Sequence, residues 1–249
     1  LIVHANSGYD NFPLELVARD DIEIIVGNPI RAMAVATYVL TQFFSHFNPS
    51  PHAEQWQSGR HWDRPAMDSL CVLLLGFGHI GKIVHAALKP IVGKVLVHDP
   101  FLGMEISDLE QQAGEAQVVI PLMSLNPTSR YLLNESLLSK LPDNFVLING
   151  ARGDLVDQTC LLNSLRKRPQ TFAYLDVFRD EPFDCREFEG LSNVRLSSHV
   201  AGVFRGIDER ILSFEETIVR DFIALSKTAF KQKHETLLLR NRIFGDFLI

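Results

Sequence analysis

A glycine-spaced turn between a predicted strand and a predicted helix constrains the fold of this chain more than any other feature. Residues 70–75 form a short apolar run typical of a buried strand, and they lead directly into Gly76-Phe77-Gly78-His79-Ile80-Gly81. We expect Gly76 to form the tight turn, Gly78 to let a phosphate approach the backbone, and Gly81 to let the following helix pack closely. The amides at the start of that helix attract anions. The motif therefore predicts a cradle for the pyrophosphate of a dinucleotide.

The acidic residue that ends the next predicted strand indicates which dinucleotide the cradle would take. Asp99 follows residues 94–98, and its carboxylate can accept hydrogen bonds from both adenosine ribose hydroxyls while repelling a 2′-phosphate. No arginine follows immediately to bind that phosphate. The pattern favours NAD over NADP. The alternatives are a strand-to-helix turn without a ligand, and a solvated turn acid beside Pro100.

Predicted strands and helices alternate along the middle of the chain. This alternation is typical of an α/β fold with a doubly wound parallel sheet of the Rossmann type, for which two βαβαβ halves are available. The predicted strands are residues 70–75, 94–98, 117–120, 145–148, 172–175 and 194–197, and the predicted helices are residues 79–88, 105–114, 134–141 and 157–168.

The two ends of the chain indicate a second, smaller domain. Residues 1–5 and 22–27 are predicted strands, and a final helix is predicted over residues 206–227. We assign residues 1–28 and 205–249 to this smaller domain and residues 29–204 to the dinucleotide-binding domain. Because a strand already begins at Leu1, we expect the smaller domain to be only partly present.

One long helix and a connection join these parts. Residues 30–47 contain no Gly or Pro and carry apolar side chains at helical spacing, which predicts one helix. Residues 48–68 contain three prolines and a glycine and are predicted to be a connection.

Composition excludes several classes of protein. The formal charge of −6 arises from 24 basic and 30 acidic residues without a basic block, so we expect no nucleic-acid partner. Three widely separated cysteines, Cys71, Cys160 and Cys185, suggest neither disulfides nor a metal site and indicate a reducing cytoplasm. The most apolar segments, 33–47 and 70–77, are too short or too interrupted to span a membrane.

Three polar side chains follow predicted strands at the edge where a parallel sheet binds ligands. They are Arg152, Glu181 and His199. Reduction of a 2-oxo acid needs a cation for its carboxylate, which Arg152 can bind with two parallel N–H bonds. It also needs a proton donor, which a histidine held by a carboxylate provides near neutral pH. Taken singly, the arginine is more often a surface charge and the histidine a structural one; together they predict a dehydrogenase site.

The chain resembles the D-2-hydroxyacid dehydrogenase family over residues 6–225. The matching segments are Ser7-Gly8-Tyr9-Asp10, Asn28-Pro29, the glycine motif with Asp99, Pro121-Leu122 with Thr128, residues 149–157, Leu175-Asp176-Val177-Phe178 with Glu181-Pro182, and residues 199–202. The resemblance implies an NAD-dependent dehydrogenase of small 2-hydroxy acids, with a flavodoxin-like substrate domain and a homodimer built on helix 30–47.

The resemblance also assigns roles to individual residues. It implies that Arg152 binds the substrate, that Glu181 polarises the histidine and that His199 is the acid/base. It implies substrate contacts at Asn6, Ser7, Gly8 and Arg152. The cofactor contacts that the motif and the resemblance predict are Gly76, Gly78, His79, Ile80, Gly81, Asp99, Pro121, Thr128, Ala151, Asp176, which would bind the nicotinamide carboxamide, and Gly202.

The sequence departs from the family pattern at two places that bear on the dimer contacts, and alternatives to an enzyme stay open. Ala36-Thr37-Tyr38 stands where the family commonly has an Ala-Glu pair, and the tail after Lys227 does not resemble the usual return to the first domain. The alternatives to an enzyme are an NAD-binding protein similar to the transcriptional corepressors of this fold, which contact protein partners, and a catalytically inactive binding protein.

Overall fold

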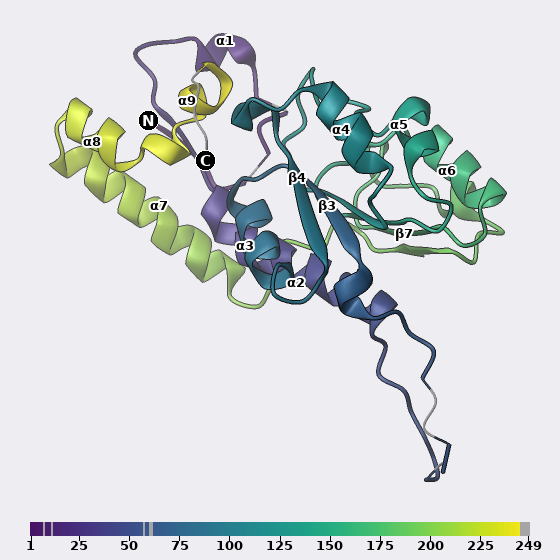
Figure 1. The fold of residues 1–249 in the computed structure, drawn as a ribbon. Helices are drawn as coiled ribbons and strands as arrows, with labels where there is room; N and C mark the ends of the chain where they lie inside the picture. Colours follow the sequence, from purple (N-terminus) through teal and green to yellow (C-terminus); the bar gives the residue numbers. More distant parts are fainter. Residues whose placement is uncertain (7, 11, 57, 60–61, 245–249) are drawn as a thin grey trace.

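Six parallel strands form the central sheet of the computed structural model, which describes residues 1–244 except 7, 11, 57 and 60–61 (Figure 1). Their order across the sheet is β4-β3-β5-β6-β7-β8, and each neighbouring pair is parallel. The strands are β3 (Cys71–Leu75), β4 (Lys94–His98), β5 (Val118–Pro121), β6 (Val146–Asn149), β7 (Phe172–Leu175) and β8 (Val194–Leu196). The predicted α/β class with a doubly wound parallel sheet is confirmed.

Helices cover both faces of the sheet because successive strand residues point to opposite sides. Val72 and Leu74 pack against α2 and α3, whereas Leu73 and Leu75 pack against α4, α5 and α6. Both faces of β3 are buried, as expected for a parallel sheet covered by helices. The helices are α2 (Asn28–Phe47), α3 (His79–Leu88), α4 (Ile106–Ala113), α5 (Glu135–Lys140) and α6 (Gln158–Lys167).

The strands are added on both sides of β3, with β4 on one side and β5, β6, β7 and β8 on the other. The chain passes from β3 through α3 to β4 and returns through α4 to β5 on the other side of β3, which gives one βαβαβ half. The second half runs β6-α6-β7-β8, and only a short 3-10 helix, Cys185–Phe188, lies between β7 and β8. The prediction of two βαβαβ halves is therefore confirmed for the first half and wrong for the second.

Two predicted helices differ from the structure by more than one residue at an end. The long helix α2 begins at Asn28, not at residue 30, because Pro29 lies in the first turn, where its missing N–H costs no helical hydrogen bond. The final predicted helix, residues 206–227, ends three residues earlier than predicted and is followed by a separate short helix. α7 (Ile207–Ala224) ends before Ser226, whose hydroxyl accepts from the backbone N–H of Ala229 and caps α8 (Lys227–Lys233).

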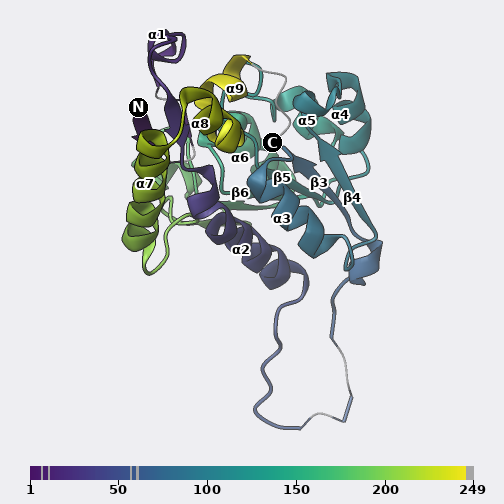
Figure 2. The ribbon, with the colours of Figure 1, turned by 90° about the vertical axis from the view of Figure 1, so that its left-hand side faces the viewer.

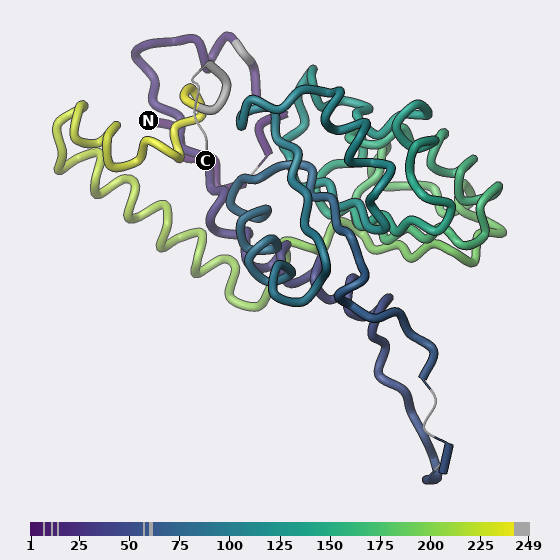
Figure 3. The backbone as a smooth tube through the Cα atoms, viewed as in Figure 1, coloured from purple at the N-terminus to yellow at the C-terminus, as the bar shows by residue number. Residues whose placement is uncertain are grey.

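A second, two-stranded parallel sheet lies beside the first and is covered by the C-terminal tail (Figures 2 and 3). It consists of β1 (Ile2–His4) and β2 (Ile24–Val26), with α1 (Leu14–Val17) between them. Val26 packs with Leu239 of α9 (Leu239–Phe244), and Ile25 packs with Ile218 and Phe230 on the other side. The tail thus packs on both faces of β2. The division of the chain at residues 28 and 205 stays a prediction.

Candidate active site

A cleft of about 730 Å³ lies at the carboxyl ends of the strands. Its wall includes residues that follow β1, β3, β5, β6, β7 and β8, and the first turns of α2 and α3. This is the position at which open parallel sheets bind ligands. Of the predicted site residues, those that line the cleft are Asn6, Gly8, Gly78, His79, Ile80, Ala151, Arg152, Glu181, His199 and Gly202. Ser7 lies outside the described residues.

The predicted acid/base histidine and its carboxylate partner form a close pair. His199 Nδ1 and Glu181 Oε2 are 2.7 Å apart, and the other Glu181 oxygen accepts from the backbone N–H of Phe178 at 3.0 Å. The imidazole side chain is 48% exposed. Because Glu181 holds Nδ1, Nε2 is the ring nitrogen available to exchange a proton with a bound molecule.

His199 is held in a left-handed backbone conformation. Its φ is +53°, which costs a non-glycine residue about 1–3 kcal/mol and persists only where neighbouring contacts impose it. Its backbone N–H donates to the carbonyl of Asp176 at 2.7 Å. The Asp176 carboxylate accepts from the next two backbone N–H groups, those of Val200 at 2.9 Å and Ala201 at 2.7 Å. Asp176 therefore fastens the turn that presents His199.

Asp176 is fully buried, at 0% exposure, and does not line the cleft. A third donor, the Ser197 hydroxyl, reaches its carboxylate at 2.6 Å, and Tyr38 Oη lies 2.8 Å from the same hydroxyl. Burial raises the pKa of Tyr38, so its phenol stays neutral in this chain of contacts. A role for Asp176 toward a nicotinamide carboxamide stays a prediction; what the contacts show is a tether between α2 and the His199 turn.

Arg152 is positioned by its own turn and by the loop that follows β1. The buried Asn149 side chain accepts from Ala151 N–H and donates to the Arg152 carbonyl, which fixes the turn. Arg152 Nε donates to Asp10 Oδ1 at 3.0 Å. Gly8 permits this arrangement, because a Cβ there would lie 1.6 Å from Arg152 Nη2. The guanidinium thus reaches the loop that, according to the family resemblance, contacts the substrate.

The glycine motif forms an open cradle at the start of α3. Gly76 has a φ of +107°, and a Cβ there would meet the backbone of Met123 at 2.8 Å; a Cβ on Gly81 would meet the Gly76 carbonyl at 2.3 Å. Gly78 is different, since no atom lies within 4 Å of the position its Cβ would take. The space above Gly78, beside the N-terminal amides of α3, fits the pyrophosphate of a dinucleotide.

The remaining predicted cofactor residues, Asp99, Pro121 and Thr128, do not line the cleft. The Asp99 carboxylate accepts from the backbone N–H of Phe77 at 2.7 Å, so it lies against the glycine turn itself. Pro121 is buried at the end of β5, beside Leu75 at the end of β3. Thr128 is exposed and bonds to the side chain of Asn126. Their contacts with a cofactor stay predictions.

Five charged residues of the cleft were not among the predicted site residues, namely Asp10, Arg31, Arg130, Asp154 and Arg179. Asp10 lies within the matching Ser-Gly loop, but its pairing with Arg152 depends on a contact between segments 142 positions apart. Arg31 lies in the first turn of α2, where a cation is opposed by the helix dipole and no acidic residue compensates it. A cation at this unfavourable position could have identified Arg31 as a candidate site residue from the sequence.

Among residues 1–244, apart from the five left out above, no group of His, Cys, Asp or Glu side chains could hold a metal ion. No helix in the same part of the chain has the length and apolarity needed to cross a membrane.

Comparisons with known proteins agree with the fold and the motifs. A family profile, D-isomer specific 2-hydroxyacid dehydrogenase, NAD binding domain, matches residues 36–201. The chain is 27% identical over 222 residues to (S)-sulfolactate dehydrogenase of Chromohalobacter salexigens, covering 82% of this chain and 71% of that relative. It is 25% identical over 237 residues to glyoxylate reductase of Thermococcus kodakarensis, covering 87% and 70%.

Solved structures share the fold. D-lactate dehydrogenase from Aquifex aeolicus, complexed with NAD and lactic acid, superposes with a TM-score of 0.74 at 19% identity, over 96% of this chain and 79% of that one. A D-isomer specific 2-hydroxyacid dehydrogenase from Xanthobacter autotrophicus Py2, in complex with NADPH and MES, gives a TM-score of 0.70 at 22% identity, over 88% and 94%.

Proposed function

Because this chain belongs to the D-isomer specific 2-hydroxyacid dehydrogenase family, we propose that it transfers a hydride between NAD(H) and a small D-2-hydroxy acid or its 2-oxo acid. The observation that carries the proposal is the His199–Glu181 pair, 2.7 Å apart, in the same cleft as Arg152 and the open Gly78 cradle. The named relatives are dehydrogenases and reductases, which favours an enzyme over a corepressor-like or inactive binding protein.

Arg152, His199 and Glu181 have separate roles in the proposed reaction. NADH, when bound, supplies the hydride to the keto carbon. Arg152 binds the substrate carboxylate through the part of its guanidinium that lies against Gly8. His199 Nε2 gives a proton to the keto oxygen as the alkoxide develops, and Glu181 stabilises the charged imidazole and holds its orientation. In the direction of oxidation, His199 takes the same proton back.

Asp99 supports a preference for NADH over NADPH. Its carboxylate is fixed beside the glycine turn by Phe77 N–H, and a negative charge there opposes a 2′-phosphate. Reduction of glyoxylate, pyruvate, hydroxypyruvate and branched 2-oxo acids, followed by the loss of NADH absorbance and repeated with NADPH, tests the proposal. We expect turnover with at least one acid and faster turnover with NADH. NADH binding without turnover on the whole panel would favour the binding-protein alternative.

A single methyl group tests the cradle. Gly78→Ala introduces a Cβ where the protein leaves open space, so the melting temperature of the protein without ligand should stay close to that of the wild type. The same methyl group occupies the approach of the pyrophosphate, and we expect the Kd for NADH to rise about tenfold or more. Isothermal titration with NADH measures this change. Unaltered NADH affinity in a folded Gly78→Ala variant would exclude the cradle as the phosphate site.

We propose a homodimer that buries the outer side of α2. Met33 on this helix is 54% exposed, and Val203 on the adjoining segment is 59% exposed; both line a shallow depression with Tyr38. The connection after α2 extends away from the body and carries Trp56, which is 89% exposed (Figures 1 and 2). Large exposed apolar side chains of this kind mark interaction surfaces. Analytical ultracentrifugation tests this: a dimer is expected for the wild type and a monomer for Met33→Glu, and a monomeric wild type would refute it.

The cytoplasmic location stays a prediction.

A further inference from the structure

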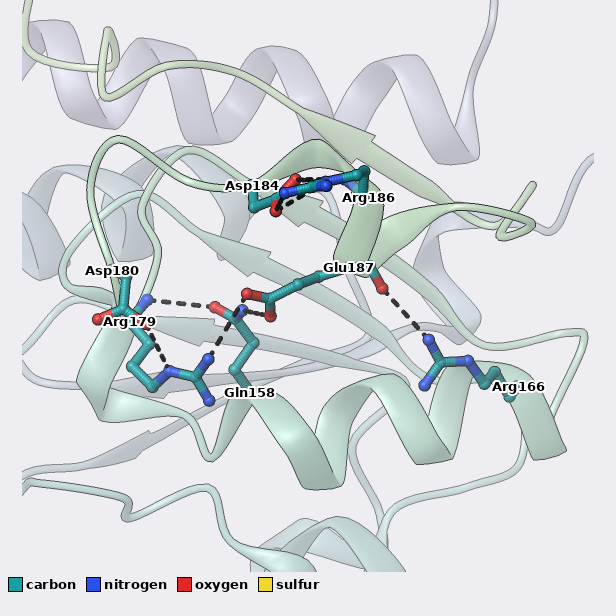
Figure 4. Close-up of polar contacts among 7 residues, drawn as sticks. All are labelled: Gln158, Arg166, Arg179, Asp180, Asp184, Arg186 and Glu187. Atoms are coloured by element: carbon teal, nitrogen blue, oxygen red, sulfur yellow. Dashed lines mark hydrogen bonds and ion pairs between the residues drawn. The ribbon is translucent and has the colours of Figure 1, made fainter.

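Arg31 differs from the other arginines that line the cleft. Arg130 pairs with Asp154, and Arg152 pairs with Asp10. Arg179 pairs with Asp180 at 2.9 Å and lies 3.6 Å from Glu187 (Figure 4). Arg31, by contrast, forms no ion pair with any carboxylate of the described residues. The cleft therefore contains one guanidinium whose charge the described part of the chain does not neutralise.

The contacts of Arg31 leave part of its hydrogen-bonding capacity unused. Nη1 donates to the carbonyl of Gly202 at 3.0 Å, and Nη2 makes only a long contact, 3.5 Å, with Asn6 Oδ1. Nε is buried and has no hydrogen-bond partner. A buried donor without an acceptor costs free energy, and so does a partly buried cation without an anion. A cation in the first turn of a helix adds a further unfavourable interaction with the helix dipole.

The side chain of Asn28, next to Arg31, also has a buried polar atom without a hydrogen-bond partner. Asn28 lies one turn before Arg31 on α2, on the same side of the helix, and both residues line the cleft. The unpartnered atom is Asn28 Oδ1. The two atoms need different partners: Arg31 Nε needs an acceptor from a bound molecule, whereas the Asn28 amide oxygen needs a donor.

Arg31 is close to both parts of the proposed catalytic machinery. It bonds to Gly202, three positions after His199, and to Asn6 in the loop that Arg152 reaches at Gly8. Because Asn6 and Gly8 are two residues apart, their Cα atoms are at most about 7 Å apart. A small molecule whose carboxylate lies on Arg152 can therefore place a second group near Arg31.

We propose that Arg31 binds a second negatively charged group on the substrate, so that the preferred substrates are 2-oxo or 2-hydroxy acids with a second carboxylate, sulfonate or phosphate. This inference rests on the proposed function and specifies its substrate class. Arg31 is then a specificity residue: it takes no part in proton or hydride transfer. A monoanionic acid leaves the charge of Arg31 unpaired, and a dianionic acid pairs it.

The test compares two acids that differ only in the second charge. Oxaloacetate carries a carboxylate where 2-oxobutanoate carries a methyl group. We expect the wild type to have the higher kcat/KM with oxaloacetate, and Arg31→Met to lower the ratio of the two kcat/KM values about tenfold or more, mainly through the KM for oxaloacetate. Arg31→Lys keeps the charge and should recover part of the ratio. Arg220→Met removes an exposed arginine of α7 outside the cleft and should leave the ratio unchanged.

A binding measurement separates this inference from the proposed function. With NADH bound, malonate should raise the melting temperature of the wild type more than acetate does, and Arg31→Met should abolish the difference. If no 2-oxo acid is reduced, the proposed function fails, and the malonate experiment still decides whether Arg31 binds a second anionic group. If Arg31→Met lowers kcat/KM equally for both acids, or weakens NADH binding, Arg31 serves the shared carboxylate or the cofactor and the inference is wrong.

Discussion

Replacing His199 with glutamine is expected to lower the turnover of NADH with a 2-oxo acid by about 10²-fold or more, while the Kd for NADH changes little. Glutamine retains a polar side chain but cannot deliver a proton to the developing alkoxide. The Gly78 cradle follows β3, whereas His199 follows β8, so the substitution lies at a different strand end. Stopped-flow reduction and NADH titration of the same variant measure the two quantities.

Glu181→Gln provides the matched control for this variant. Its amide keeps the shape of the side chain and can still accept from Phe178 N–H, but it removes the carboxylate from His199 Nδ1. Because Glu181 acts through His199, we expect a smaller loss than for His199→Gln and no additional loss in the double variant. A His199→Gln enzyme with turnover within about threefold of the wild type would remove His199 from the mechanism.

The strands and the position of the cleft followed from the sequence because local patterns and the parallel topology determine them. The bounds of α3, β4 and β7 agree with the predicted ones, since short apolar runs and glycine turns mark them directly. The site residues that follow β6, β7 and β8 meet at one edge because parallel strands all end on the same side. Periodicity and one topological rule were sufficient for these features.

Features that depend on contacts between distant segments were not predictable from periodicity. The tail after Lys227 had no interpretation in the sequence, and the structure places Phe230 and Leu239 on the two faces of the small sheet. The Asp10–Arg152 pair and the neutral Tyr38–Ser197 contact also join segments that no local pattern relates. Burial of a strand predicts that something covers it, but it does not specify which segment.

Asp176→Ala is expected to have the largest effect on stability. It removes the acceptor of three hydrogen bonds, from the Ser197 hydroxyl and from the backbone N–H groups of Val200 and Ala201, at a site with no solvent exposure. Each buried donor left without an acceptor costs about 1–3 kcal/mol, so the free energy of unfolding should fall by about 3 kcal/mol or more. Urea denaturation of the protein without ligand measures the loss. Asp180→Ala, which removes an exposed acid paired with Arg179, should leave this free energy nearly unchanged.

The same substitution separates two roles for Asp176. If the carboxylate tethers the turn, its loss lets the left-handed His199 backbone relax, and turnover should fall together with stability, even at saturating NADH. Asp176→Asn keeps one acceptor oxygen and the size of the side chain, so it should recover part of the stability and part of the turnover. A residue that only bound the nicotinamide would show the opposite pattern: normal stability in both variants and a raised Kd for NADH. Stability, Kd and turnover of the two variants therefore decide whether Asp176 acts through the backbone that carries His199 or on the cofactor directly.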